Sequence, residues 1–336
     1  MHKNIYNKTA YLSLILLASG LLVSCSSGAG MRKSTSPAHP LLFVHRAGHK
    51  GKIFSQNSLR AVVRTLSRLN KPKQFDGIEV DIVLTGDNVP VLAHEPWVNN
   101  KYCLKKEQGV FKKFKGFPLI RDFSVKILQS HFKCGGFPIV TLDFLLELMQ
   151  RVPNVALYLD VKIDERYTQS PKNYAQAVFI ALRKRPPSSR LFIEVPDKKS
   201  MDAFYAVKKE GYLPIVSLPV FKSEKKDGSR QAALLMAKTA KCLSSGTCSP
   251  LKKALEAGAK AVAAPQTIMP KEPVIQAGKK GIGSVLFLQA PSRLIQKEQL
   301  KDYCRWPLTA IIADFPEYGN CKSILEKKPS TKKGCL

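Results

Sequence analysis

The sequence lacks several patterns that define common protein classes. No two of its eight cysteines are spaced Cys-x-x-Cys, which argues against a structural zinc site. No Gly-x-Gly-x-x-Gly segment follows the first predicted strand, which argues against a dinucleotide-binding Rossmann domain. No recognisable nucleic-acid-binding motif is present. The N-terminal apolar stretch is broken by Ser19-Gly20 and is shorter than the roughly 20 residues that span a membrane.

Acidic residues are also scarce. The chain has 25 Asp and Glu against 54 Lys and Arg, a formal net charge of +29. So basic a protein attracts polyanions such as phosphate head groups, anionic lipid or nucleic acid. The lysines are dispersed, with local crowding at 101–115 and 322–333. We interpret this as a solvated basic surface close to a membrane. The run Lys105–Lys115 is also a candidate for resting on anionic lipid.

The first 24 residues resemble a secretory signal peptide. Lys3 and Lys8 precede an apolar stretch at 11–18, as in the basic and hydrophobic regions of such signals. The segment ends Leu-Val-Ser-Cys25, which resembles the lipobox of bacterial lipoproteins and implies cleavage before Cys25 and acylation of its thiol. An ordinary signal peptide, with Cys25 incidental, is the alternative.

The segments that flank the central region are expected to be simple in structure. Residues 25–40, rich in Ser, Gly and Pro, predict a flexible tether, and residues 326–336 a basic tail. The lipobox implies an exported protein, anchored in a membrane and facing the periplasm or the cell surface. Export also permits disulfides. Neighbouring cysteines suggest the pairs 103/134, 242/248 and 304/321, with Cys335 left over, although spacing alone does not fix connectivity.

Short β-rich runs alternate with helical patterns over residues 41–325. Strands are expected at 41–47, 77–85, 89–95, 155–163, 190–195, 213–220, 259–265, 284–289 and 309–314. Helices are expected at 58–69, 141–151, 172–185, 198–211, 229–243, 272–280 and 296–305. Such alternation predicts a parallel sheet. Roughly eight units over about 285 residues fit a (β/α)8 TIM barrel better than an open sheet. Residues 97–137 break the rhythm and predict an insertion.

Charged residues occur on two strands that are otherwise apolar. Glu79 and Asp81 lie two positions apart, so their side chains share one face of a strand, and the same holds for Asp160 and Lys162. Charges buried without partners are prohibitive in free energy. Carboxylates that converge inside a barrel would repel each other, and a divalent cation removes that repulsion. Oxygen ligands select Mg²⁺ or Ca²⁺ over Zn²⁺.

Two histidines follow strands. His45 comes at the end of the first strand, where TIM-barrel active sites lie, and His94 follows a later strand. Arg46 can present a bidentate guanidinium to a phosphate. A single histidine at a strand end is more often structural, but two of them beside a metal site suit a phosphodiesterase. One histidine can protonate the leaving oxygen while the other acts as base or nucleophile.

These residues resemble the glycerophosphodiester phosphodiesterase family, in order along the chain. The matching motifs are His45-Arg46-x-Gly48, Gln56-Asn57-Ser58, Glu79-x-Asp81, Thr85-x-Asp87, His94-Glu95, Asp160-x-Lys162 and Asp314-Phe-Pro316. The resemblance implies a TIM-barrel phosphoric diester hydrolase that forms glycerol 3-phosphate and an alcohol. It implies a divalent metal, Ca²⁺ or Mg²⁺, on Glu79, Asp81 and Asp160. It implies that His45 and His94 form the acid/base pair, with Arg46 and Lys162 on the phosphate.

Some positions depart from the family pattern. Ala47 stands where the family has Gly, Gln56 where it has Glu, and Asp160 where it has Glu. Gln56 and Asn57 either support the site or simply start the first helix as polar caps. Asp160-x-Lys162 also resembles the sphingomyelinase D barrels, which act on choline phospholipids. Three hypotheses therefore stay open: a glycerophosphodiester phosphodiesterase, a sphingomyelinase D-like phospholipase, and a surface lipoprotein whose barrel serves as a binding module.

Overall fold

The computed structural model describes most of the chain after residue 38. The described residues are 39–48, 55–69, 75–152, 154–187, 190–207, 212–217, 258–266, 269, 271–288, 293–314 and 319–326. The predicted signal peptide and Cys25 lie outside them, as do the predicted helix 229–243 and the cysteines 242, 248 and 335. Within the described part of the chain no helix has the length and apolar character needed to cross a membrane.

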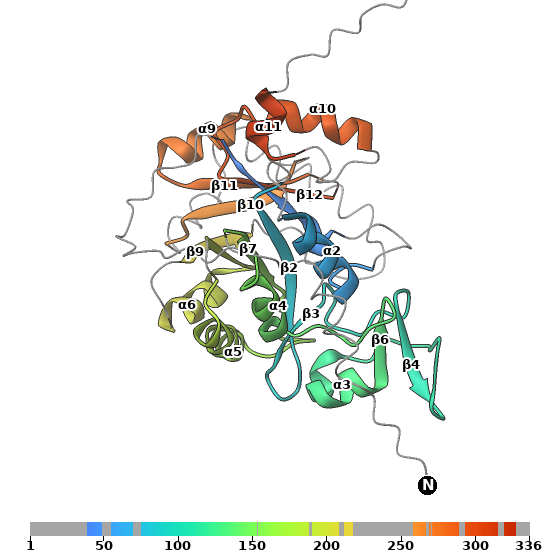
Figure 1. Ribbon diagram of the computed structural model, residues 1–336. Helices are drawn as coiled ribbons and strands as arrows, with labels where there is room; N and C mark the ends of the chain where they lie inside the picture. Colours follow the sequence, from blue (N-terminus) through green and yellow to red (C-terminus); the bar gives the residue numbers. More distant parts are fainter. Residues whose placement is uncertain are drawn as a thin grey trace, which may run out of the picture. The chain divides into compact units, whose positions relative to one another are not determined.

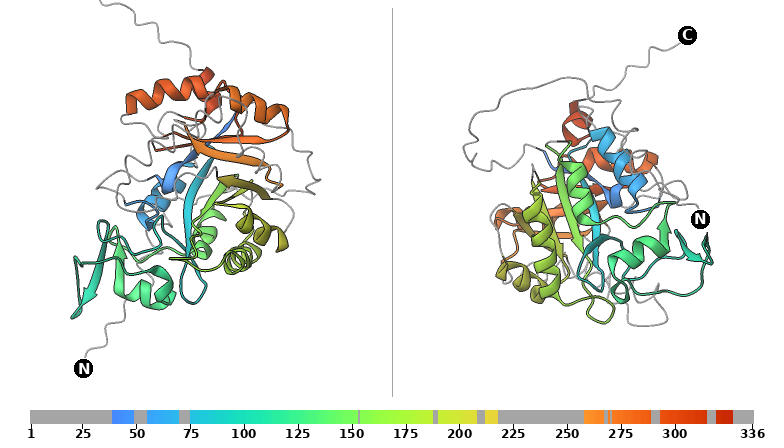
Figure 2. Two further views of the ribbon diagram at one scale, coloured as in Figure 1. Left: turned by 180° about the vertical axis from the view of Figure 1, so that it is seen from behind. Right: turned by 60° about the horizontal axis from the view of Figure 1, so that its bottom comes forward.

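Eight parallel strands close into a ring (Figures 1 and 2). They are β1 (Leu41–Val44), β2 (Gly77–Leu84), β7 (Ala156–Val161), β8 (Leu191–Val195), β9 (Tyr212–Ser217), β10 (Ala261–Pro265), β11 (Gly283–Leu288) and β12 (Ala310–Ala313). Each pairs with the next, and β1 closes the ring by pairing with both β12 and β2. The expected TIM barrel is confirmed.

The interior of the barrel is packed with side chains from alternate strand positions. Phe43, Tyr158 and Phe192 form a cluster of buried rings, with centroids 5.3–5.8 Å apart. Alanines on β10 and β12 complete the same cluster, so small residues face large ones across the barrel. Gly77 belongs to this arrangement, since a Cβ there would overlap the Phe43 ring and the Ala156 carbonyl.

The opposite face of each strand packs against helices. The described helices around the barrel are α2 (Leu59–Leu69), α4 (Leu142–Met149), α5 (Pro171–Lys184), α6 (Lys198–Ala206), α9 (Lys271–Lys279), α10 (Arg293–Tyr303) and α11 (Cys321–Glu326). A second, larger core fills the space between strands and helices. The helix starts carry side-chain caps from Thr141, Ser170 and Asp197, each accepting a bond from a backbone N–H of the first turn.

Several predicted strands were too long, and two of these differences concern the segments that precede the histidines. The first strand was expected to run to Ala47, but β1 ends at Val44 and a 3-10 turn, η2 (His45–Ala47), comes next. Arg46 and Ala47 have φ angles of 49° and 60°, which a strand does not allow. The strand expected at 89–95 is reduced to β3 (Pro90–Leu92), which pairs antiparallel with β2 in a hairpin and is not a member of the ring.

Between β3 and α4 the chain forms a small antiparallel sheet with order β5-β4-β6. Its elements are β4 (Cys103–Glu107), β5 (Val110–Lys112), η3 (Ile120–Asp122), α3 (Val125–His131) and β6 (Phe132–Cys134). A disulfide joins Cys103 to Cys134, and a third hydrophobic cluster links this sheet to Val83 of β2. We call residues 97–137 the insertion. A second disulfide joins Cys304 to Cys321 at the ends of α10 and α11, so two of the three suggested pairs are confirmed.

Candidate active site

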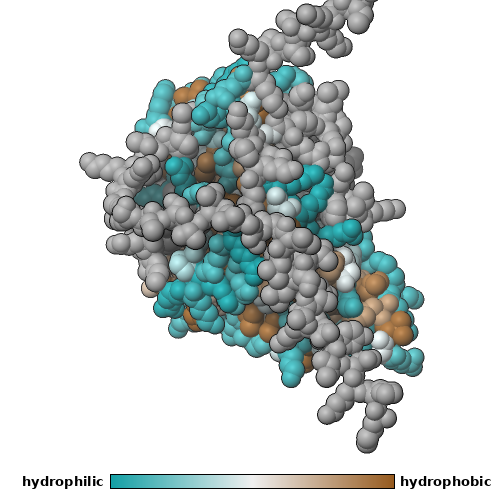
Figure 3. All heavy atoms as spheres, viewed as in Figure 1, coloured by the Kyte–Doolittle hydropathy of each residue, from teal (hydrophilic) through white to brown (hydrophobic). Residues whose placement is uncertain are grey.

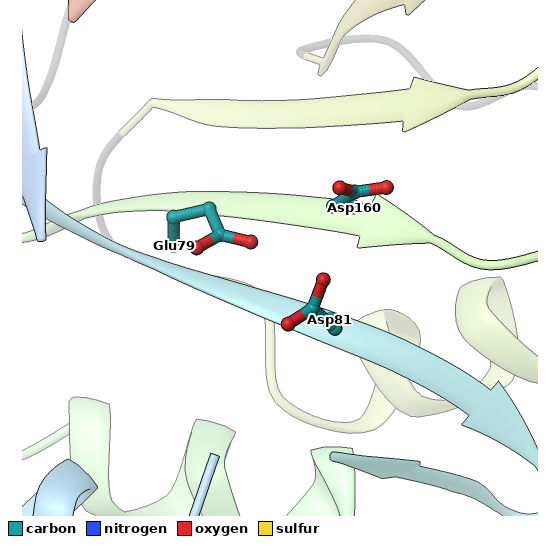
Figure 4. A group of neighbouring side chains, drawn as sticks. All are labelled: Glu79, Asp81 and Asp160. Carbon is teal, nitrogen blue, oxygen red and sulfur yellow. The ribbon is translucent and has the colours of Figure 1, made fainter. Parts of the chain in front are cut away.

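Three carboxylates converge inside the barrel from two adjacent strands (Figure 4). Glu79 and Asp81 come from β2 and Asp160 from β7, where Asp81 and Asp160 are direct neighbours in register. One oxygen from each of the three lies within 4.8 Å of the others, and the side chains are buried. This brings together the three ligands expected from the sequence, at a spacing that suits one cation.

The carboxylate of Glu79 is only partly hydrogen-bonded. Its Oε2 accepts a hydrogen bond of 2.5 Å from the backbone N–H of Arg46. Its Oε1 is buried and has no hydrogen-bond partner among the described residues. Burial, together with the charges of Asp81 and Asp160, raises the pKa of Glu79 well above its ordinary value. A buried oxygen without a partner beside two further carboxylates fits a hard divalent cation.

Asp81 is held ionised by its neighbours. Lys162 Nζ lies 2.9 Å from Asp81 Oδ1 and also binds Asp160, and Asn57 Nδ2 donates to Asp81 Oδ2 at 2.7 Å. Burial would raise the pKa of Asp81, but its interactions with Lys162, His94, Arg46 and Asn57, of which Lys162 contributes most, lower it below its usual range. The same pairing overcomes the burial of Lys162 and raises the pKa of its ammonium group. Asn57 therefore contacts the site directly, from a backbone with φ 55°.

His45 follows β1 directly. Its ring is oriented by a residue that lies close in space but near the C-terminal end of the sequence. Its Nδ1 lies 2.6 Å from Oδ1 of Asp314, which follows β12. The ring is buried and lies edge-on to Phe287 of β11, with centroids 6.0 Å apart. An imidazole held at Nδ1 by a carboxylate has a fixed orientation and a defined tautomer.

His94 lies beside the same carboxylate cluster. The backbone N–H of Ala93 donates to the carbonyl of Asp81, which places the following histidine next to β2. His94 Nδ1 lies 3.3 Å from Glu95 Oε1. Burial would raise the pKa of Glu95, but its interactions with His94, Asn99 and Arg46 together lower that pKa.

Gln56 bridges Arg46 and Glu95. Its Oε1 accepts a bond of 2.7 Å from the Arg46 guanidinium, and its Nε2 donates to Glu95 at 3.2 Å. Arg46 Nε also lies 3.7 Å from Asp81. The amide thus connects an arginine on one side with the His94–Glu95 pair on the other. A pocket next to this chain of contacts is lined by Gln56, Asn57, His94, Glu95 and residues of the insertion.

Two further polar residues inside the barrel were missed from the sequence. Glu194 of β8 is buried next to Asp160 in register, and it accepts a bond of 2.5 Å from Tyr158. Burial and the Glu194 carboxylate raise the pKa of Tyr158 well above its ordinary value. The signal was available, because Glu194 interrupts the apolar run Leu191-Phe-Ile-Glu-Val195 in the way that Glu79 and Asp160 interrupt theirs.

Comparisons with known proteins identify the fold. No protein-family model matches the sequence, and no curated protein matches it. The chain is similar to the structure of an Oleispira antarctica phosphodiesterase in complex with the product sn-glycerol-3-phosphate, with TM-score 0.60 and 15% identity, over 86% of this chain and 98% of that one.

Two further neighbours have the same fold. A glycerophosphodiester phosphodiesterase from Parabacteroides distasonis matches with TM-score 0.58 and 16% identity, over 85% and 96% of the two chains. One from Agrobacterium tumefaciens matches with TM-score 0.52 and 14% identity, over 83% and 97%. The structural neighbours are therefore TIM-barrel glycerophosphodiester phosphodiesterases, and at this identity the likeness shows the fold.

Proposed function

We propose that the protein is a metal-dependent phosphodiesterase that hydrolyses glycerophosphodiesters to glycerol 3-phosphate and an alcohol. The observation that carries this proposal is the convergence of Glu79, Asp81 and Asp160 with His45, which follows the carboxyl end of β1, and with His94, which follows the hairpin strand β3. That edge is where TIM-barrel enzymes place their active sites. The structural neighbours, which include a phosphodiesterase with bound glycerol 3-phosphate, support the same chemistry.

His45 and His94 are proposed as the acid/base pair. The carboxylate of Asp314 holds Nδ1 of His45, so proton transfer by His45 would proceed through Nε2. Asp314 would also stabilise the imidazolium that forms after proton uptake. Glu95 Oε1 lies 3.3 Å from His94 Nδ1, and its negative charge would stabilise a protonated His94. Two histidines, each next to a carboxylate, can take a proton from the attacking group and give one to the leaving oxygen.

Arg46 and Lys162 are proposed to bind the phosphate. Both are cations at the edge of the carboxylate cluster, and both keep contact with Asp81. Glu79, Asp81 and Asp160 would hold the divalent cation, Ca²⁺ or Mg²⁺. When bound, such a cation neutralises charge on the phosphate and helps to position it. The protein groups orient the diester between the two histidines, which contributes through proximity.

The direct test is a head-group release assay with glycerophosphocholine. Release of glycerol 3-phosphate should require Ca²⁺ or Mg²⁺ and should stop with EDTA. His45→Ala and His94→Ala should each lower kcat by about 100-fold or more, as expected for loss of a general acid or base. His131→Ala, an exposed histidine of α3, serves as control. Unchanged turnover in both site variants, together with no divalent cation bound in calorimetry, would favour a binding module.

One residue favours a second candidate. Asp160 is one methylene shorter than the Glu expected in the glycerophosphodiesterase pattern, and Asp160-x-Lys162 resembles the sphingomyelinase D barrels. Cleavage of lysophosphatidylcholine or sphingomyelin, with no cleavage of the deacylated diester, would establish that alternative.

We also propose that the protein is exported and anchored in a membrane through acylation of Cys25. The lipobox-like Leu-Val-Ser-Cys25 supports this. Mass spectrometry of the mature N-terminus is the test. A Cys25 that begins the mature chain and carries lipid is expected, and cleavage elsewhere with an unmodified thiol would contradict it.

A further inference from the structure

The edge strand of the insertion combines exposed apolar side chains with a high density of lysine. Strand β5 pairs with β4 alone among the described strands, and the segment that continues it reaches Phe117. Residues 110–117 read Val-Phe-Lys-Lys-Phe-Lys-Gly-Phe and contain no acidic residue. Lys106 of β4 lies opposite Phe111 of β5 in register. We call residues 110–117 together with Lys106 the basic edge.

The hydrophobic residues of the basic edge are divided between buried and exposed positions. Phe114 packs on Phe132 in the hydrophobic cluster of the insertion, so the segment is anchored. Val110 and Phe117 are instead 65% and 64% exposed, the highest values among the large hydrophobic side chains of the described residues. In Figure 3 hydrophobic residues gather among hydrophilic ones at the lower right, where Figure 1 places β4 and β6.

The positive charge of this part of the protein is only weakly compensated. The insertion contains nine Lys and Arg but only two acidic residues, Glu107 and Asp122. Lys112 pairs with Glu107, whereas Lys106 and Lys115 are exposed and form no ion pair within the described part of the chain. Exposed lysines on an edge strand also prevent pairing with other sheets. That role does not account for Val110 and Phe117, which would favour aggregation.

We propose that the basic edge docks on the surface of an anionic lipid bilayer. An interfacial site of this kind needs apolar side chains that enter the acyl boundary and cations around them that attract the anionic head groups. A soluble polyanion would be attracted by the lysines alone, and Val110 and Phe117 would add nothing. Phe117 lies edge-on to Trp97, with ring centroids 5.8 Å apart. Trp97 is three residues from His94, so the docked surface is joined to the candidate active site.

Binding to vesicles tests the proposal, and it requires no turnover. The full chain is mixed with vesicles of phosphatidylcholine alone or of phosphatidylcholine with phosphatidylglycerol, and partition is measured by sedimentation at low and high salt. Binding should be stronger with phosphatidylglycerol and should weaken with salt. Hydrogen exchange of the wild-type protein should show protection in residues 104–118 when these vesicles are added.

Two variants separate the apolar from the charged contribution. The apolar variant carries Val110→Ser and Phe117→Ser, and the charge variant carries Lys106→Glu and Lys115→Glu. Each should weaken partition into vesicles about tenfold. The matched control carries Ile180→Ser and Lys172→Glu, exposed positions on α5, and should bind like the wild type. The proposal is overturned if residues 104–118 gain no protection, or if both variants partition like the control. It is also overturned if only the lysine variant loses binding and duplex DNA competes fully, which would indicate a polyanion site.

Discussion

The Nδ1 atom of His45 lies 2.6 Å from Oδ1 of Asp314, although 269 positions of sequence separate the two residues. They follow β1 and β12, which are neighbours in the ring. The first and last strands of a parallel barrel meet only when the barrel closes. Closure of the fold and orientation of the proposed catalytic histidine are therefore one structural event.

Asp314→Asn should lower kcat by about 100-fold or more while the fold is retained. An amide does not stabilise the imidazolium and can select the wrong tautomer of His45. Steady-state kinetics on glycerophosphocholine measure the loss, and circular dichroism reports on the fold. Asp302→Asn, an exposed position of α10, is the control. Wild-type turnover in Asp314→Asn would show that this contact does not serve catalysis.

The stability of the metal-free protein should fall as pH rises, because of Glu79. Its pKa in the folded protein is raised above the ordinary 4.5, so between these two values the folded state holds a proton that the unfolded chain has lost. The free energy of unfolding therefore decreases with pH in that window. Thermal unfolding in EDTA should show a shallower pH dependence for Glu79→Gln than for the wild type. Added Ca²⁺ or Mg²⁺ should stabilise the wild type more at the upper end of the window. Identical slopes would contradict this.

Lys162→Met should separate turnover from metal binding. Lys162 contacts Asp81 and Asp160, so its loss removes a cation that competes with the metal for the same carboxylates. Metal affinity should be unchanged or higher in calorimetry, while kcat falls by about 100-fold or more because the phosphate loses a positive partner. Lys172→Met on the surface of α5 is the control. Parallel loss of metal binding and turnover would instead indicate a structural role for Lys162.

Gln56→Glu should destabilise the protein even though the family pattern has Glu at this position. Gln56 donates to Glu95, and a carboxylate in its place loses that hydrogen bond and puts two negative charges side by side. A decrease of about 1 kcal/mol in the free energy of unfolding is expected from chemical denaturation. Gln150→Glu, exposed at the end of α4, should be neutral. A stabilised Gln56→Glu variant would mean that the gain at Arg46 outweighs the repulsion at Glu95.

Removal of the Cys103–Cys134 disulfide should loosen the insertion and leave the barrel intact. The bond spans 31 residues and ties β4 to β6. Its loss through Cys103→Ser with Cys134→Ser should cost about 3 kcal/mol of local stability. Limited proteolysis should then cut within residues 97–137. The same double change at Cys304 and Cys321 should leave this region protected. Equal resistance of the Cys103/Cys134 variant and the wild type would show that packing alone holds the insertion.

The barrel and most of the carboxylate cluster could be predicted from local sequence patterns. Alternation of strand and helix is a local pattern, and it predicted a parallel barrel that the structure confirms. The two-residue period of a strand is also local, so Glu79 and Asp81 had to share a face. Neighbouring cysteines suggested the pairs 103/134 and 304/321 for a similar reason, since short segments bring such residues together.

Which of these local segments come into contact depends on the three-dimensional fold. Strand register put Asp160 opposite Asp81 and Glu194 beside Asp160, and a one-residue slip would have turned either side chain away. Left-handed backbone at Arg46 and Ala47 ended β1 early and turned the Arg46 amide onto Glu79. Closure of the ring brought Asp314 to His45. Register and closure depend on contacts between residues far apart in the chain, which a local periodicity does not encode.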